Sequence, residues 1–282
     1  MAGLFNNLSE EKAEHPLAIV EDSVKLVSAL RKYNTRLPWF ELVPPILRHY
    51  VPYFKTSTPR DFNREKTIGG ELLKPMTNED ISFIMIDGFL AGTDTTANMI
   101  SFITYYLAHN PDVKMKMYEE IDRRFQGDIT RWVTEDDLRS LKYCEAIIKE
   151  VARVFPIFHA FGRVIDKPEE VAGYQWPAGS YFRINADAVH GNKNHWKDAD
   201  KFNPDRWMDE EFEPEKYSFI MFGGGPRLCP GRKLAMIELV GLMALIFRKY
   251  EIDLVDIESP LKTTSLGMSV LHGLSVKVKL RI

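Results

Sequence analysis

A cluster of three glycines precedes one of the two cysteines of the chain, in the segment FGGGPRLCPG at residues 222–231. Glycine lets the backbone approach a large flat ligand closely. The segment leads into a stretch with helical spacing, and the free N–H groups at a helix start stabilise a thiolate. The pattern therefore predicts a metal ligand or a nucleophile at Cys229, with Arg227 near enough to hold an acidic group of the ligand. A buried structural cysteine is the alternative interpretation.

A second cluster, AGTDTT at residues 91–96, lies in the middle of a long predicted helix. Three threonines and a glycine are poor helix formers. A threonine hydroxyl can bond back to a carbonyl one turn earlier and loosen the helix, and such widening is typical of functional sites. On the residues alone, a kinked core helix is the simpler interpretation.

A third feature is the pair Glu150 and Arg153 in the segment KEVARVFP. Carboxylate and guanidinium groups at this spacing usually form a solvated surface pair that contributes roughly 0.3 kcal/mol. The segment FNPDRW at residues 202–207 contains a second arginine, Arg206, that could share the Glu150 carboxylate.

Together these segments resemble the cytochrome P450 family. FGGGPRLCPG matches the haem-binding signature Phe-x-x-Gly-x-Arg-x-Cys-x-Gly, with its fixed positions at Phe222, Gly225, Arg227, Cys229 and Gly231. The resemblance implies that the Cys229 thiolate ligates the iron of a haem b, that Phe222 packs beside the sulfur, and that Arg227 pairs with a haem propionate. Thiolate ligation pushes electron density onto iron and favours O–O cleavage.

The resemblance extends to the other segments. AGTDTT is similar to the oxygen-binding motif of the family, which implies that Asp94 feeds protons and that Thr95 holds dioxygen and water. Arg163 follows at a position that often supplies a second propionate contact. The stretches from Phe155 to Phe161 and from Leu266 to Ser269 resemble substrate-lining segments, and ordinary core packing is an equally good interpretation of both.

FNPDRW resembles the Phe-x-Pro-x-Arg segment of the family. Glu150, Arg153 and Arg206 then match its buried charge triad. One carboxylate shared by two guanidinium groups is structural: it locks the loop that presents the cysteine and takes no part in the chemistry.

The resemblance implies a haem-thiolate monooxygenase. Such an enzyme inserts one oxygen atom of O2 into an apolar organic substrate, using electrons from an NADPH-cytochrome reductase or a ferredoxin-type donor. A truncated, catalytically impaired haem-binding remnant is one alternative. A haem-thiolate isomerase or dehydratase is another, and Asp94 and Thr95 argue against it because such enzymes have little use for a proton-delivery pair.

Composition narrows the function classes. With a net charge of −3, the chain lacks the excess of basic residues that is typical of nucleic-acid-binding proteins. Two cysteines in 282 residues argue against a disulfide scaffold. The acidic start is unlike a signal peptide, and no apolar stretch qualifies as a membrane anchor. By the family pattern we expect a location on the cytoplasmic side or peripheral to the endoplasmic reticulum membrane.

The periodicity predicts mainly α-structure with a small, segregated β-sheet late in the chain. Expected helices lie at residues 17–34, 77–110, 112–126 and 231–249, and residues 134–155 are expected to hold one or two more. Two short strands are expected around a Pro-Ala-Gly turn within residues 169–189, and a half-buried strand within 275–282.

The expected domains are a partial lid or helical segment at 1–76 and the haem-binding C-terminal region at 77–282. The early Trp-x-x-x-Arg motif of the family is missing, since none of the five tryptophans has an arginine four residues later. We therefore expect a fold truncated at the N-terminus.

Overall fold

The structure is a computed structural model that describes residues 66–68, 71–73, 78–265 and 267–281. It divides into two compact units, Met1–Ile86 and Asp87–Ile282, and each is considered by itself. The helix expected at 17–34 and residue 77, the expected start of the next helix, lie outside the described residues, and the domain boundary at 76/77 stays a prediction.

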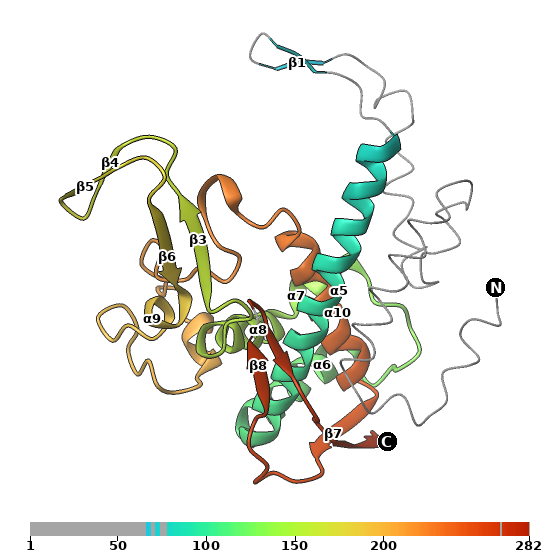
Figure 1. Cartoon of the computed structure of the whole chain (residues 1–282). Coiled ribbons are helices and arrows are strands. Elements are labelled where there is room, and N and C mark those ends of the chain that lie inside the picture. Colours follow the sequence, from blue (N-terminus) through green and yellow to red (C-terminus); the bar gives the residue numbers. More distant parts are fainter. Residues whose placement is uncertain (1–65, 69–70, 74–77, 266, 282) are drawn as a thin grey trace. The chain divides into compact units, whose positions relative to one another are not determined.

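Helices dominate, as the sequence predicts (Figure 1). The α-helices are α5 (Asn78–His109), α6 (Pro111–Phe125), α7 (Glu135–Ser140), α8 (Lys142–Val154), α9 (Ala186–His190) and α10 (Arg232–Phe247). Two 3₁₀ helices, η4 (Pro204–Met208) and η5 (Gly225–Arg227), lie between α9 and α10. No helix among the described residues has the length and apolar character needed to span a membrane.

Local sequence signals set several helix ends. Pro111 occupies the first turn of α6, where its missing N–H is not needed, and α5 ends just before it. Thr134 begins α7 with a capping box, in which its side chain and that of Asp137 each bond the backbone of the other residue. Of the one or two helices expected within 134–155, the structure has two, α7 and α8.

The β-structure of the described residues consists of two-stranded antiparallel ribbons. The pairs are β1 (Lys66–Ile68) with β2 (Glu71–Leu73), β3 (Ala160–Val164) with β6 (Tyr181–Asn185), β4 (Glu169–Val171) with β5 (Tyr174–Trp176), β7 (Tyr250–Leu254) with β10 (Val276–Leu280), and β8 (Thr263–Ser265) with β9 (Ser269–Leu271). The two strands beside the Pro-Ala-Gly turn, β5 and β6, do not pair with each other, because each has its partner in an earlier strand.

The prediction of a half-buried strand at the end of the chain is wrong. The alternating residues form strand β10, but its apolar side chains are exposed: Val276 by 38%, Val278 by 55% and Leu280 by 60%. Within the described residues β10 pairs only with β7, and no described element buries this apolar face.

The hydrophobic core of the second unit is formed by α5, α6, α8 and α10. Phe102, Ile121, Ile147 and Met243, one from each helix, have no exposed surface or almost none. Cys144 of α8 is equally buried, so it is a structural cysteine, and burial raises the pKa of its thiol well above the ordinary value.

A buried histidine joins α9 to the segment that leads to the glycine cluster. His190 is fully buried, and its Nε2 accepts the backbone N–H of Ile220 at 2.9 Å. Burial lowers the pKa of the His190 imidazole from 6.5 to about 4. The ring is therefore neutral at pH 7, as an acceptor nitrogen requires.

We expect the free energy of unfolding to fall as the pH is lowered from about 6.5 to about 4. In this range the unfolded chain binds a proton that folded His190 resists, so the contribution is complete above pH 6.5 and declines by roughly 3 kcal/mol as the pH approaches 4. Urea unfolding at several pH values measures the decline.

His190→Gln is the matched variant, because its amide oxygen can accept the same N–H but cannot titrate. It should flatten the pH dependence in this window. Arg131 holds the pKa of Asp137 well below its usual range, so that carboxylate loses its contribution only below about pH 3.8. An unchanged pH slope in His190→Gln would contradict the assignment.

Candidate functional site

Cys229 lies at the end of a loop that is closed by backbone hydrogen bonds. The Cys229 N–H donates to the carbonyl of Phe222 at 3.0 Å, and the Leu228 N–H donates to the carbonyl of Gly225 at 3.0 Å. Gly223 and Gly225 have φ angles of +77° and +65°, which L side chains rarely adopt. The glycine cluster is therefore needed to form the loop. Cys229 is half-buried, three residues before the first residue of α10.

Strand β3 packs beside this loop. A side-chain carbon added at Gly223 would lie 3.7 Å from the ring of Phe161. Arg163, two residues further on the same strand face, donates to the carbonyl of Gly224 at 3.3 Å. Of the two predicted propionate contacts, Arg163 thus lies against the loop, while Arg227 lies in it with an exposed side chain.

The threonine cluster forms a regular part of α5. The Thr95 hydroxyl donates to the carbonyl of Ala91 at 2.7 Å, which is the back-bonding that the sequence predicts. The helix nevertheless remains α-helical through the cluster, so the expected loosening is absent at residues 91–96. Asp94 is exposed, whereas Thr95 is half-buried.

A contact between α5 and α10 brings the threonine cluster close to the helix that follows the cysteine. The Thr96 hydroxyl lies 3.4 Å from Oε2 of Glu238, and burial raises the pKa of the Glu238 carboxyl. Sequence reasoning missed Glu238. The available signal was a single carboxylate within the very apolar stretch LAMIELVGLMALIF.

The structure brings Glu150, Arg153 and Arg206 together. Arg153 binds the Glu150 carboxylate through Nε at 2.9 Å and a terminal nitrogen at 2.8 Å, and Arg206 Nε reaches it at 3.2 Å. Glu150 and Arg153 are 0% and 2% exposed, so the pair is buried and not a surface pair.

Two further groups, which sequence reasoning missed, bind the same carboxylate. The backbone N–H of Asn203 and the indole N–H of Trp207 each donate to Glu150 at 2.9 Å. The remaining N–H groups of Arg153 donate to the carbonyls of His190, Ala199 and Lys201. The cluster therefore joins α8 to η4 and to the chain segment that precedes it.

The two stretches that resemble substrate-lining segments are in contact. The Ser269 N–H donates to the carbonyl of Ile157 at 2.7 Å, and the Ser269 hydroxyl lies 2.7 Å from Nε2 of His159. Residue 266 lies outside the described residues. His159 and His195 each pair with one carboxylate, that of Asp187 and that of Glu215 respectively.

The donor set at Cys229 fits a haem. The described residues contain no group of three or more His, Cys, Asp or Glu side chains that could hold a metal ion. A structural zinc ion needs four protein ligands, whereas a haem iron takes four ligands from the macrocycle and can take its axial ligand from one thiolate. No heavy atom lies within 4 Å of a side-chain carbon added at Gly224, which leaves space beside the loop for a flat group.

Known proteins are similar to most of the chain. Residues 46–280 match the family model described as Cytochrome P450. The chain is 33% identical to the mouse mitochondrial 1,25-dihydroxyvitamin D(3) 24-hydroxylase over 285 aligned positions, which cover 95% of the chain and 54% of that relative. It is 35% identical to rat cytochrome P450 4V2 over 213 positions, covering 73% of the chain and 39% of the relative.

The fold is also similar to solved structures. The crystal structure of the cytochrome P450DA heme domain superposes with a TM-score of 0.69 at 25% identity, covering 74% of this chain and 46% of that one. The chain thus spans about half the length of the relatives it matches. Because the family model matches residues 46–280, which is most of the chain, and the Cys229 loop is formed, the chain belongs to the cytochrome P450 family.

Proposed function

We propose that the chain is a haem-thiolate monooxygenase that inserts one oxygen atom of O2 into an apolar organic substrate. The observation that carries the proposal is the Cys229 loop, which offers one half-buried sulfur beside β3 and space for a flat group. The names of the relatives support it, since they include a hydroxylase.

In this proposal Cys229 ligates the haem iron through its thiolate, and Arg163 and Arg227 hold the propionates. The bound haem supplies oxygen activation. The electrons come from an NADPH-cytochrome reductase or a ferredoxin-type donor, and turnover assays with each donor distinguish the two.

Thr95 and Asp94 are the proposed proton-handling groups. The Thr95 hydroxyl donates its own proton to Ala91, so the lone pairs of Oγ1 are free to accept a hydrogen bond from water. Asp94 is exposed, so it can exchange protons with solvent. The pair can therefore carry protons from solvent to the reaction site.

We expect Thr95→Ala to keep the haem spectrum but to divert reducing equivalents from product to hydrogen peroxide. The variant loses the Oγ1 atom that positions the proton donor. The ratio of product formed to NADPH consumed measures this, and we expect it to fall by about tenfold or more.

Thr104→Ala is the matched control for this variant. Its hydroxyl makes the same back-bond on the same helix, to Ile100 at 2.9 Å, but lies outside the AGTDTT cluster. Coupling should be unchanged there. Parental coupling in Thr95→Ala would rule out the proposed role.

The carbon monoxide difference spectrum of the reduced, haem-loaded chain tests the proposal as a whole. A red-shifted band reports haem, thiolate ligation and an intact site together. Absence of the band from folded protein supplied with haem would refute haem-thiolate chemistry. A band without turnover with either electron donor would instead indicate a haem-binding, non-catalytic chain.

A further inference from the structure

The side chain of Asn98 on α5 makes hydrogen bonds to two different elements. Its Nδ2 group donates to the backbone carbonyl of Asp94 at 2.9 Å, one helical turn earlier. Its Oδ1 atom accepts the backbone N–H of Leu271 on β9, also at 2.9 Å. The second bond spans 173 positions of the chain. One half-buried amide thus joins α5 to the β8–β9 hairpin.

Both bonds require an amide at position 98. The Leu271 N–H can only donate, so the oxygen of the Asn98 amide must lie against it. The Asp94 carbonyl can only accept, so the amide nitrogen must lie there. A carboxylate has no N–H group to offer the carbonyl, and an apolar side chain makes neither bond. The residue type is therefore matched to both partners.

On the hairpin side, Asn98 takes the place of a neighbouring strand. The N–H groups of Ser269 and Leu271 point to the same edge of β9, because alternate residues of a strand do so. The Ser269 N–H donates to the carbonyl of Ile157 at 2.7 Å, and the Leu271 N–H donates to Asn98. The other edge of β9 pairs with β8. Asn98 therefore supplies the acceptor that a further strand would offer to the Leu271 N–H.

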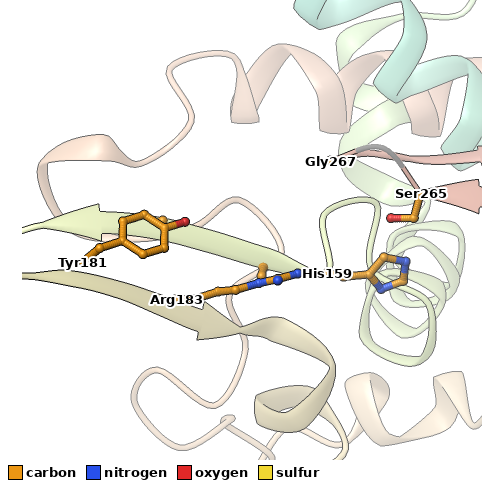
Figure 2. A pocket seen from close by; sticks show the side chains of 7 residues that line it. His159, Tyr181, Arg183, Ser265 and Gly267 are labelled. Carbon is orange, nitrogen blue, oxygen red and sulfur yellow. The ribbon is translucent and has the colours of Figure 1, made fainter.

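The hairpin has a second attachment at Ser269. The Ser269 hydroxyl lies 2.7 Å from Nε2 of His159, and the serine is fully buried. His159 also lines one hollow with Ser265 and Gly267 of the hairpin turn (Figure 2). Because this attachment does not involve α5, loss of the Asn98 bond should release α5 from β9 without unfolding the hairpin.

On the helix side, Asn98 holds the peptide group between the two proposed proton-handling residues. The carbonyl that it binds belongs to the peptide bond from Asp94 to Thr95. The Thr95 hydroxyl binds the carbonyl of Ala91 by the same one-turn pattern. That bond stays within α5, whereas the Asn98 amide connects its carbonyl to β9. The orientation of the peptide group is therefore set relative to the hairpin.

We propose that Asn98 is a positioning residue for proton delivery. It fixes the peptide group between Asp94 and Thr95 against β9, and thereby keeps the Asp94 carboxylate and the Thr95 hydroxyl in the relative position that proton transfer needs. The inference rests on the proposed monooxygenase function, in which these two residues handle the protons. Asn98 acts through them and transfers no proton itself.

Asn98→Leu removes both hydrogen bonds and keeps a branched side chain. Exchange of the Leu271 amide hydrogen, followed by NMR, should become about tenfold faster or more, because its N–H loses its acceptor. In the haem-loaded protein the carbon monoxide band should stay in place. The ratio of product formed to NADPH consumed should fall by roughly fivefold, the factor that corresponds to one neutral hydrogen bond.

Asn98→Asp separates the two bonds. Its carboxylate still accepts the Leu271 N–H, so that amide should keep its slow exchange. It has no N–H group for the Asp94 carbonyl, so the coupling ratio should fall as it does in Asn98→Leu. Ser101→Ala is the matched control, because its hydroxyl makes the same one-turn bond, to the carbonyl of Ala97 at 2.8 Å, with no hydrogen bond to another described element. Both measurements should be parental there.

Unchanged exchange of the Leu271 amide in folded Asn98→Leu would overturn the connection to β9. Parental coupling in Asn98→Leu or Asn98→Asp, with Thr95→Ala uncoupled, would overturn the positioning role. Equal loss of coupling in Ser101→Ala would also overturn it, because any one-turn bond on α5 would then have the same effect. Failure of the monooxygenase proposal is seen separately, in the carbon monoxide spectrum and in Thr95→Ala, and the exchange measurement requires neither haem nor turnover.

Discussion

Replacing Glu150 with alanine is expected to lower the free energy of unfolding by about 3–5 kcal/mol, which is enough to leave much of the protein unfolded or insoluble. The carboxylate is fully buried and accepts hydrogen bonds from Arg153, Arg206, Trp207 and the backbone of Asn203. Its removal leaves the Arg153 guanidinium, itself 2% exposed, without its counter-charge.

The measurement is chemical unfolding followed by circular dichroism, together with the haem content of the soluble fraction. Glu135→Ala is the control, because it also removes a glutamate paired with an arginine. That pair, with Arg139, is 72% and 76% exposed, so its loss should cost less than about 1 kcal/mol. A soluble Glu150→Ala protein with parental stability and haem content would show that the buried cluster is not structural.

The same cluster shows how much of the site can be predicted from the sequence. The spacing of Glu150 and Arg153 is compatible with a surface pair, and only the resemblance of KEVARVFP and FNPDRW to family segments indicated burial and added Arg206. Trp207 and the Asn203 N–H also donate to the Glu150 carboxylate, and no local sequence pattern predicts these two contacts. Their roles depend on how η4 packs on α8, which is a tertiary property.

Strand pairing was the weakest part of the prediction for a similar reason. Alternation identifies a strand but not its partner: the strands on either side of the Pro-Ala-Gly turn, β5 and β6, each pair with an earlier strand. Alternation also gave the two faces of β10 correctly, but burial of one face requires a covering element, and none covers it among the described residues. Helix positions were predicted better, because prolines and caps mark their ends locally.

The site was predictable where the chemistry depends on a local motif. The glycines of the Cys229 loop are needed for positive φ angles, and the Thr95 back-bond spans one helical turn. The contact of Thr96 with Glu238 joins residues 142 positions apart, on α5 and α10. Such contacts become visible only in the folded chain.

Replacing Cys229 with serine is expected to abolish the red-shifted carbon monoxide band completely. A serine hydroxyl stays protonated at neutral pH and is a neutral oxygen donor, so it cannot provide the electron density of a thiolate. The other cysteine of the chain cannot substitute. Cys144 is 0% exposed in the helical core, and burial raises the pKa of its thiol, which keeps it protonated.

Cys144→Ala is the matched control for this experiment. It removes a buried sulfur and should cost about 1 kcal/mol of stability, yet the haem-loaded variant should keep the band at its parental position. Retention of the band in Cys229→Ser, or its loss in folded, haem-loaded Cys144→Ala, would reassign the ligand. Loss of the band in Cys229→Ser alone would identify the half-buried sulfur at the end of the glycine loop as the iron ligand, because both variants lack one thiol and only their positions differ.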